Sequence, residues 1–262
     1  MRKVTQIVLG LLLGFSIQVA CSLSVRPSAH PNPASDPHDT QELVLAHVQP
    51  AANRTERYLA EIAFETKSLK PGQQWGGGYH QPRYERYSCS IGKNGMSAHK
   101  KEGDGMTPVG KFRLLKMYYR PDRVKPPSFV SSQDTSNGTT STPESAPSNM
   151  LPWIPLQPDD AWCDDPNSPL YNQHVKLPFN GSHEALWRAD RLYDYIGVLD
   201  YNIRPNTTKG LGSAIFFHVR SGENPTAGCI AVDREVMDRI APALTLDTVF
   251  WVDSNPVQPV GQ

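Results

Sequence analysis

Two short apolar runs in the C-terminal part of this chain each lie with a residue that can do chemistry. The first run, Ile215 to Val219, contains His218. The second, Ile230 to Val232, directly follows Cys229 in the small-residue step Thr226-Ala227-Gly228-Cys229. Aromatic and β-branched residues in a run this short predict a strand and not a helix. We therefore expect a β-structure that presents a cysteine nucleophile and a histidine base.

The chemistry of a cysteine nucleophile explains the residue types around it. A free thiol is only a few per cent thiolate near neutral pH, so an imidazole or peptide dipole must favour the thiolate. Gly228 places no side chain beside the sulfur, so substrate and backbone N–H groups can approach it closely. We take Cys229, His218 and Gly228 as the candidate catalytic residues. The alternative for such a pair met in isolation is a buried structural cysteine and a core histidine.

Two blocks of the sequence resemble the L,D-transpeptidase catalytic domain, the YkuD-like family. One block is Gly212 to His218 together with Thr226 to Cys229. The other is Lys100 to Phe112, which has the Thr-Pro-x-Gly-x-Phe core typical of that family. The resemblance runs from about Tyr87 to about Val252. It implies a mainly β fold, a β-sandwich or barrel-like catalytic domain with a few short helices.

The sequence departs from the family pattern at two positions near the nucleophile. The family often has Ser-His-Gly-Cys where this chain has Thr226-Ala227-Gly228-Cys229, and often has Arg or Asn where this chain has Ala231. The nucleophile and base are kept, but two polar groups are lost. The resemblance therefore implies a divergent branch that binds its substrate through groups elsewhere.

Four further residues are candidates for substrate binding. Trp162, Tyr171 and Asn172 belong to a stretch that resembles one in this branch of the family, and aromatic and amide groups suit a peptide groove. Arg220 lies close to the candidate base and could meet a substrate carboxylate. The alternatives are a structural turn held by Asp165 and Asn172, and a solvated surface arginine.

The resemblance implies that the substrate is a peptidoglycan stem peptide. Cys229 would attack the amide between diaminopimelate or lysine and a terminal D-alanine, forming a thioester, and His218 would take the thiol proton. The amine of a neighbouring stem, a lipoprotein amine or water would release the acyl group. Two other classes stay open: an L,D-carboxypeptidase, endopeptidase or other amide-bond acyltransferase on the same fold, and a non-catalytic cell-envelope binding module.

The N-terminus predicts export. Positive charge at Met1 to Lys3 precedes a mostly apolar, uncharged run from Ile7 to Val19, which is the length of a signal-peptide core and short for a membrane span. Cys21 follows this run, so lipid attachment to Cys21 and cleavage after Ser22 both stay open. We expect residues 1–22 to be a signal peptide and the protein to reach the periplasm or cell envelope.

Composition divides the remaining chain. The 19 glycines and 24 prolines, about a sixth of the chain, favour turns and short strands. We expect a disordered tether at 23–40, the catalytic domain at 41–253, a low-complexity surface insert at 128–150 and a tail at 254–262. Expected strands lie at 42–48, 58–66, 84–91, 110–119, 196–201, 213–219 and 248–252. Helices are expected at 184–194 and 233–244, the second with Asp233 as its N-cap.

Charge and cysteine content bear on partners. The chain has 26 basic and 26 acidic residues and no basic run longer than Lys100-Lys101, so we expect no nucleic-acid partner. No Cys-x-x-Cys or His/Cys spacing indicates a metal site, and we expect no cofactor and a monomer. Cys89 and Cys163 would face an oxidising compartment, where one disulfide and two buried thiols are both open.

Overall fold

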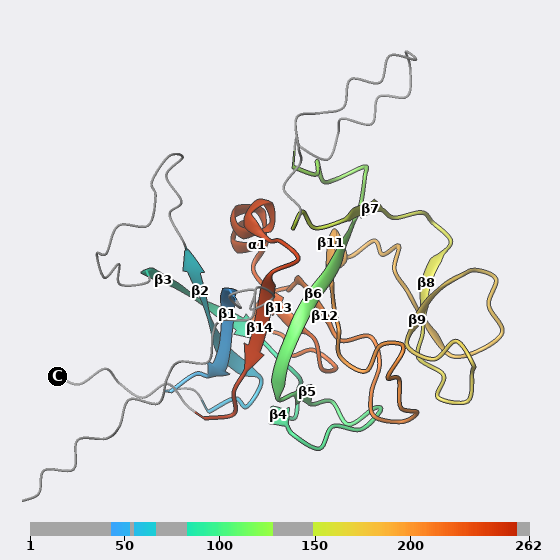
Figure 1. The fold of residues 1–262 in the computed structure, drawn as a ribbon, viewed down its shortest axis with the longest axis horizontal. Helices are drawn as coiled ribbons and strands as arrows, with labels where there is room; N and C mark the ends of the chain where they lie inside the picture. The colour runs from blue at the N-terminus through green and yellow to red at the C-terminus, as the bar shows by residue number, and fades with distance from the viewer. Residues whose placement is uncertain (1–42, 53–54, 67–82, 128–148, 256–262) are drawn as a thin grey trace, which may run out of the picture. The chain divides into compact units, whose positions relative to one another are not determined.

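The computed structural model describes residues 43–52, 55–66, 83–127 and 149–255 (Figure 1). The predicted signal peptide and tether lie outside these residues, and so do 128–148 of the predicted insert and 256–262 of the tail. Met150, the last residue of the predicted insert, belongs to the fold because it forms a β-bridge with Thr245.

Eight strands close into a barrel. Their order is β11-β12-β13-β3-β2-β1-β14-β6, and β6 pairs again with β11. Two neighbouring pairs, β12–β13 and β1–β14, are parallel, and the others are antiparallel. The expected mainly β, barrel-like fold is therefore confirmed. The strands are β1 (Leu43–Pro50), β2 (Leu59–Thr66), β3 (Arg83–Ser90), β6 (Gly110–Tyr119), β11 (Tyr195–Leu199), β12 (Phe216–Val219), β13 (Ile230–Val232) and β14 (Thr248–Val252).

The barrel is filled by every second side chain of its strands. In β6, Phe112 and Leu114 are buried while Lys111 and Arg113 are exposed, the period of two that a strand requires. Full burial of one such aliphatic or aromatic side chain stabilises the fold by about 1.5–3 kcal/mol. Fully buried side chains of the barrel core include Ile62, Leu114, Met117, Phe217 and Phe250.

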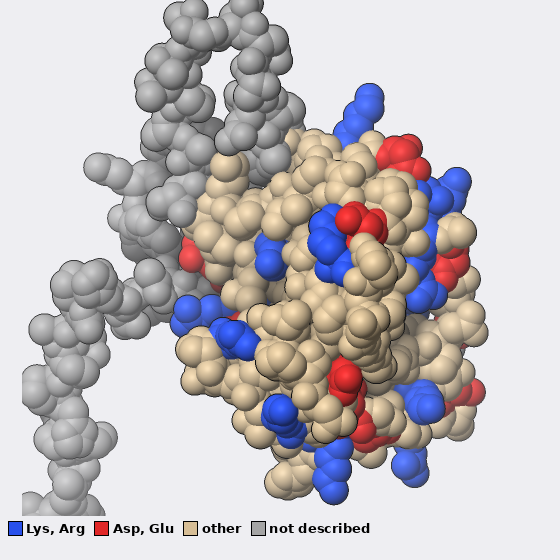
Figure 2. Space-filling model, turned by 90° about the vertical axis from the view of Figure 1, so that its right-hand side faces the viewer, with Lys and Arg blue, Asp and Glu red and all other residues tan. Residues whose placement is uncertain are grey.

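Shorter elements surround the barrel. A second sheet of order β10-β8-β9 packs beside it through Trp162, whose ring meets Phe216 edge-on at 5.1 Å. Figure 2, seen from the side of β8 and β9, shows basic and acidic side chains mixed over this face. The short strands are β4 (Met96–Ser97), β5 (Thr107–Pro108), β7 (Trp153–Pro155), β8 (Asp160–Cys163), β9 (Gln173–Lys176) and β10 (His183–Ala185).

The helix predicted at 184–194 was wrong. This segment begins in β10, which pairs with β8, and continues through turns to Asp194. Leu186 and Tyr193 are buried in the apolar cluster around Phe216, and that burial produced the helix-like spacing. The helix-like spacing therefore came from two buried residues, Leu186 and Tyr193, of a segment that is not helical.

The helix predicted at 233–244 is shorter than expected. It is α1 (Arg234–Ile240), followed by a 3₁₀ turn at Ala241–Ala243 that contains Pro242. Asp233 occupies the N-cap position, but its carboxylate makes no capping hydrogen bond because it binds Arg220. No helix in the described part of the chain is long and apolar enough to span a membrane.

Candidate active site

The parallel pairing of β12 and β13 brings the candidate base and nucleophile to one face of the sheet. Phe217 is paired with Ile230, and both side chains point into the barrel core. Side chains alternate along a strand, so His218 lies on the other face. Cys229, directly before Ile230, packs in the outer cluster with Phe216. His218 and Cys229 line the same cavity, of about 340 Å³.

The Cys229 thiol is held by two backbone groups. The Phe216 N–H donates to Sγ at 3.4 Å, and the thiol donates to the Ala214 carbonyl oxygen at 3.2 Å. Burial, followed by the nearby Glu184 carboxylate, raises the pKa of Cys229 to about 12. The resting sulfur is therefore a thiol, and it could act as a nucleophile only with the help of a base.

His218, the candidate base, has a defined tautomer. Its Nδ1 lies 2.7 Å from the Val219 carbonyl oxygen, which can only accept, so Nδ1 carries the proton and Nε2 holds the free lone pair. The Tyr193 ring meets the imidazole edge-on at 5.2 Å and fixes its plane. Burial lowers the pKa of His218 to about 4, which keeps the ring neutral at pH 7. A neutral imidazole can accept the thiol proton as the sulfur attacks.

Gly228 is required by its surroundings. Its φ is +150°, and a Cβ there would lie 2.8 Å from the Met106 carbonyl oxygen. The Gly228 N–H donates to Thr226 Oγ1 at 3.1 Å, and that hydroxyl donates to the Cys229 carbonyl oxygen at 2.7 Å. Backbone N–H groups at Gly228 and Cys229 are candidate donors to an oxyanion. Because the Gly228 N–H already donates to Thr226, the Cys229 N–H is the better candidate of the two.

Asn172 holds the segment that receives the thiol. Its Oδ1 accepts from Trp162 Nε1 at 2.9 Å and from the Ala214 N–H at 3.0 Å, while its Nδ2 donates to the carbonyl oxygens of Tyr201 and Asn202. Ala214 has a φ of +51°, an unfavourable value for alanine that needs such support. Trp162 and Asn172 therefore hold Ala214, whose carbonyl oxygen accepts from the Cys229 thiol, and neither residue lines the cavity.

Tyr171 supports the same segment from another side. Its hydroxyl donates to the Glu102 carboxylate and accepts from the Gly212 N–H at 3.1 Å. Ser213 Oγ donates to the same carboxylate at 2.8 Å. Burial, together with the bond to Glu102, raises the pKa of Tyr171 and keeps it protonated. Tyr171 thus joins Glu102 to the backbone at Gly212, two residues before Ala214.

Arg220 lies at the cavity wall with its charge already paired. Its guanidinium donates to both Asp233 oxygens at 2.8 and 2.7 Å and to Ser88 Oγ at 3.3 Å. Its side chain is only 6% exposed. The arrangement is a bidentate ion pair that fastens β12 to the start of α1, and a substrate carboxylate would have to compete with Asp233.

Comparison with known protein families gives one match. The family model of the L,D-transpeptidase catalytic domain, YkuD, matches residues 76–258, more than half of the chain. The chain belongs to this family. No curated protein and no solved structure gave a match. The YkuD assignment therefore rests on the family match and on a barrel consistent with it.

Several charged residues of this YkuD domain line the cavity without having been predicted from the sequence. Lys100 and Glu102 were part of the matching block, but nothing in a Lys-Lys pair signals burial. Glu184 and Arg188 lay in the segment expected to be helical. The charged and phenolic groups of the cavity wall are Lys100, Glu102, Asp164, Glu184, Arg188 and Tyr193, in addition to His218 and Arg220.

One side of the YkuD cavity is acidic. Glu184 accepts from the Tyr193 hydroxyl at 2.6 Å and lies 3.6 Å from the Arg188 guanidinium. Burial raises the pKa of Glu184, and the hydrogen bond from Tyr193 lowers it by a smaller amount. Asp164 Oδ1 is buried and has no hydrogen-bond partner among the described residues. Two acidic residues, Glu184 and Asp164, therefore lie in the cavity wall, the first of them beside Arg188.

The two remaining described cysteines of the YkuD domain are separate. Cys89 lies on β3 and Cys163 on β8, and both are buried free thiols. Burial raises the pKa of Cys89 far above that of a free thiol. Of the two arrangements left open by the sequence, the structure has the unlinked one.

Proposed function

We propose that this protein is an L,D-transpeptidase that acts on peptidoglycan stem peptides through a thioester on Cys229. One observation carries the proposal: in a YkuD domain, Cys229 and His218 line the same cavity, and the contact of Nδ1 with Val219 leaves Nε2 of His218 free to accept a proton. A non-catalytic binding module would not need the proton of His218 fixed on Nδ1.

The reaction begins at the amide bond between the third stem residue and the terminal D-alanine. Cys229 Sγ attacks the carbonyl carbon while its proton passes to His218 Nε2. The tetrahedral intermediate collapses, the C–N bond breaks, and His218 returns the proton to the departing D-alanine amine. A thioester to Cys229 remains. An acceptor amine then attacks it and regenerates the thiol.

The acidic side of the cavity supports a substrate that carries an amine. Diaminopimelate and lysine both end in an ammonium group, and the Glu184 and Asp164 carboxylates complement that charge. The same complementarity favours an amine acceptor over water. We therefore propose crosslinking between two stems as the main outcome, with hydrolysis as the competing one.

The proposed substrate lies outside the cytoplasm. We propose that residues 1–22 export the protein to the periplasm or cell envelope, with lipid attachment at Cys21 and cleavage after Ser22 as the two routes. Mass spectrometry of the mature protein's N-terminus distinguishes them, since a lipidated Cys21 adds the mass of its acyl chains. An uncleaved N-terminus at Met1 would contradict export by a signal peptide.

The test of the activity uses protein that begins after residue 22. Incubation with a disaccharide-tetrapeptide should give a dimer that has lost one D-alanine, detected by mass. A disaccharide-tripeptide alone would indicate an L,D-carboxypeptidase. Cys229→Ala is the matched control and should give neither product. Turnover that persists in Cys229→Ala, or no turnover by the wild-type protein, would contradict the proposal.

A further inference from the structure

A buried ammonium group lies next to the nucleophile. Lys100 belongs to the loop between β4 and β5, yet its side chain is only 4% exposed and lines the catalytic cavity. Its charge acts on Cys229 and favours the thiolate, against the larger effect of burial. An amine this deeply buried needs a partner, because an unpaired charge would be expelled or neutralised.

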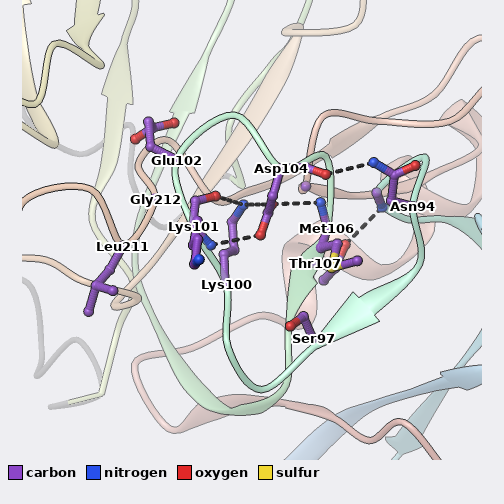
Figure 3. Close-up of polar contacts among 12 residues, drawn as sticks. Asn94, Ser97, Lys100, Lys101, Glu102, Asp104, Met106, Thr107, Leu211 and Gly212 are labelled. Atoms are coloured by element: carbon purple, nitrogen blue, oxygen red, sulfur yellow. Dashed lines mark hydrogen bonds and ion pairs between the residues drawn. The ribbon is translucent and has the colours of Figure 1, made fainter.

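Asp104 holds this ammonium in place (Figure 3). Lys100 Nζ donates to Asp104 Oδ1 at 2.8 Å and to the Lys101 carbonyl oxygen at 3.3 Å. The same carboxylate accepts from the backbone N–H groups of Lys101 and Met106, at 2.7 and 2.9 Å. Burial opposes ionisation of Asp104, but these donors prevail and lower its pKa. At neutral pH Asp104 is therefore a carboxylate, and it pairs with Lys100 Nζ.

Two glycines leave room for Lys100 beside the reacting sulfur. A Cβ on Gly212 would lie 2.9 Å from Lys100 Cε, and a Cβ on Gly228 would lie 3.4 Å from Lys100 Nζ. The ammonium has three N–H bonds, and the described residues accept from two of them, through Asp104 and Lys101. The third is available to the cavity at the Gly228-Cys229 step.

We propose that Lys100 is a catalytic residue that donates a hydrogen bond to the oxyanion of the tetrahedral intermediate. As Cys229 Sγ adds to the carbonyl carbon, the electron pair of the C=O bond moves to oxygen. Lys100 stabilises that negative charge and keeps its own proton, and the pair returns to the C=O bond when the intermediate collapses. The Cys229 N–H would be the second donor, since Thr226 engages the Gly228 N–H.

A purely structural ion pair accounts less well for this arrangement. The loop turn already has the Asp104 carboxylate bound by two backbone N–H groups, which need no lysine. A methionine would fill the same channel between the glycines without the cost of burying a charge. A buried charge is expected where it stabilises charge that develops during a reaction.

The proposal rests on the cysteine mechanism but not on the stem peptide, so its test uses small reagents. p-Nitrophenyl acetate acylates a thiol through a tetrahedral oxyanion, whereas iodoacetamide alkylates it by displacement at a saturated carbon, without an oxyanion. Both rates are measured on Cys229 by mass in the wild type, in Lys100→Met and in Lys101→Met. Lys101 is the matched control because it is the neighbouring lysine and is exposed.

We expect Lys100→Met to lower the ester acylation rate by about 100- to 1,000-fold, the range for loss of one oxyanion donor. The alkylation rate should change by less than about tenfold, and Lys101→Met should match the wild type in both. Equal losses in both reactions would show that Lys100 acts only on the thiol. No loss in either would show that its role is structural, and both results overturn the proposal.

Two additions keep the test decisive. If Lys100→Met melts below the assay temperature, both rates are measured at a lower temperature at which the variant is folded, and an unchanged ratio of the two rates there overturns the proposal. His218→Gln should lower both rates together, because it removes the base from both reactions. Failure of stem-peptide turnover with a preserved Lys100 effect on the ester would reject the proposed substrate and leave the role of Lys100 standing.

Discussion

Replacing Asn172 by alanine tests whether the buried amide supports the catalytic segment. The substitution removes the acceptor of two buried donors, the Trp162 Nε1–H and the Ala214 N–H. A buried donor left unsatisfied costs about 1–3 kcal/mol. Asn172 also has a φ of +57°, where alanine is less favourable than asparagine by about 1 kcal/mol. Allowing for partial relaxation, we expect Asn172→Ala to lower the free energy of unfolding by about 3–5 kcal/mol.

Urea unfolding measures this loss. With an m-value of about 2 kcal/mol/M, the midpoint should fall by about 2 M. Asn206→Ala is the control, because Asn206 is exposed, and its effect should stay within about 0.5 kcal/mol. A loss below about 1 kcal/mol for Asn172→Ala would refute the reasoning, since it would mean that the four hydrogen bonds of Asn172 contribute little. At a temperature where the variant is folded, acylation of Cys229 should slow, because Ala214 no longer holds the thiol.

Three other measurements test the site. Cys229→Ala should abolish acylation and change the melting temperature by only a few degrees, because it removes a single buried sulfur atom; residual acylation would place the nucleophile elsewhere. Burial lowers the pKa of His218 from 6.5 to about 4, so its contribution to stability is full above pH 6.5 and falls by about 3 kcal/mol as pH drops to 4. His218→Gln should remove this part of the pH dependence, and an unchanged curve in urea titrations would contradict the burial argument. Denatured, unreduced protein should react with N-ethylmaleimide at Cys89, Cys163 and Cys229; protection of the first two would show a disulfide.

The sequence predicted the barrel strands well because their pattern is local. The first half of β6 alternates exposed and buried side chains from Lys111 to Leu114, and β14 carries an aromatic and β-branched run. His218 and Cys229, the candidate base and nucleophile, each lie in a recognisable motif, and the structure places both at one cavity. The segment 184–194 was mispredicted because its apolar residues contact a distant cluster and do not form a helical stripe.

The roles of the polar residues depend on contacts that no local pattern encodes. Asn172 was expected to contact substrate, but it binds Ala214, 42 positions along the chain. Lys100 and Lys101 are identical neighbours in sequence, and only the fold shows that one is buried in the cavity and the other is exposed. Arg220 could be placed near His218 from the sequence, whereas its pairing with Asp233 required the start of α1.

The closure of the barrel has a consequence for how the protein is produced. The family match begins at residue 76. Two of the eight barrel strands, β1 and β2, lie before that residue, since β2 ends at Thr66. A polypeptide trimmed to 76–258 would leave the backbone N–H and C=O groups of β3 and β14 unpaired along one edge. Such edges can pair with a strand of a second molecule. Expression boundaries drawn from the family alignment should therefore yield insoluble material, and those drawn before Leu43 should yield monodisperse enzyme.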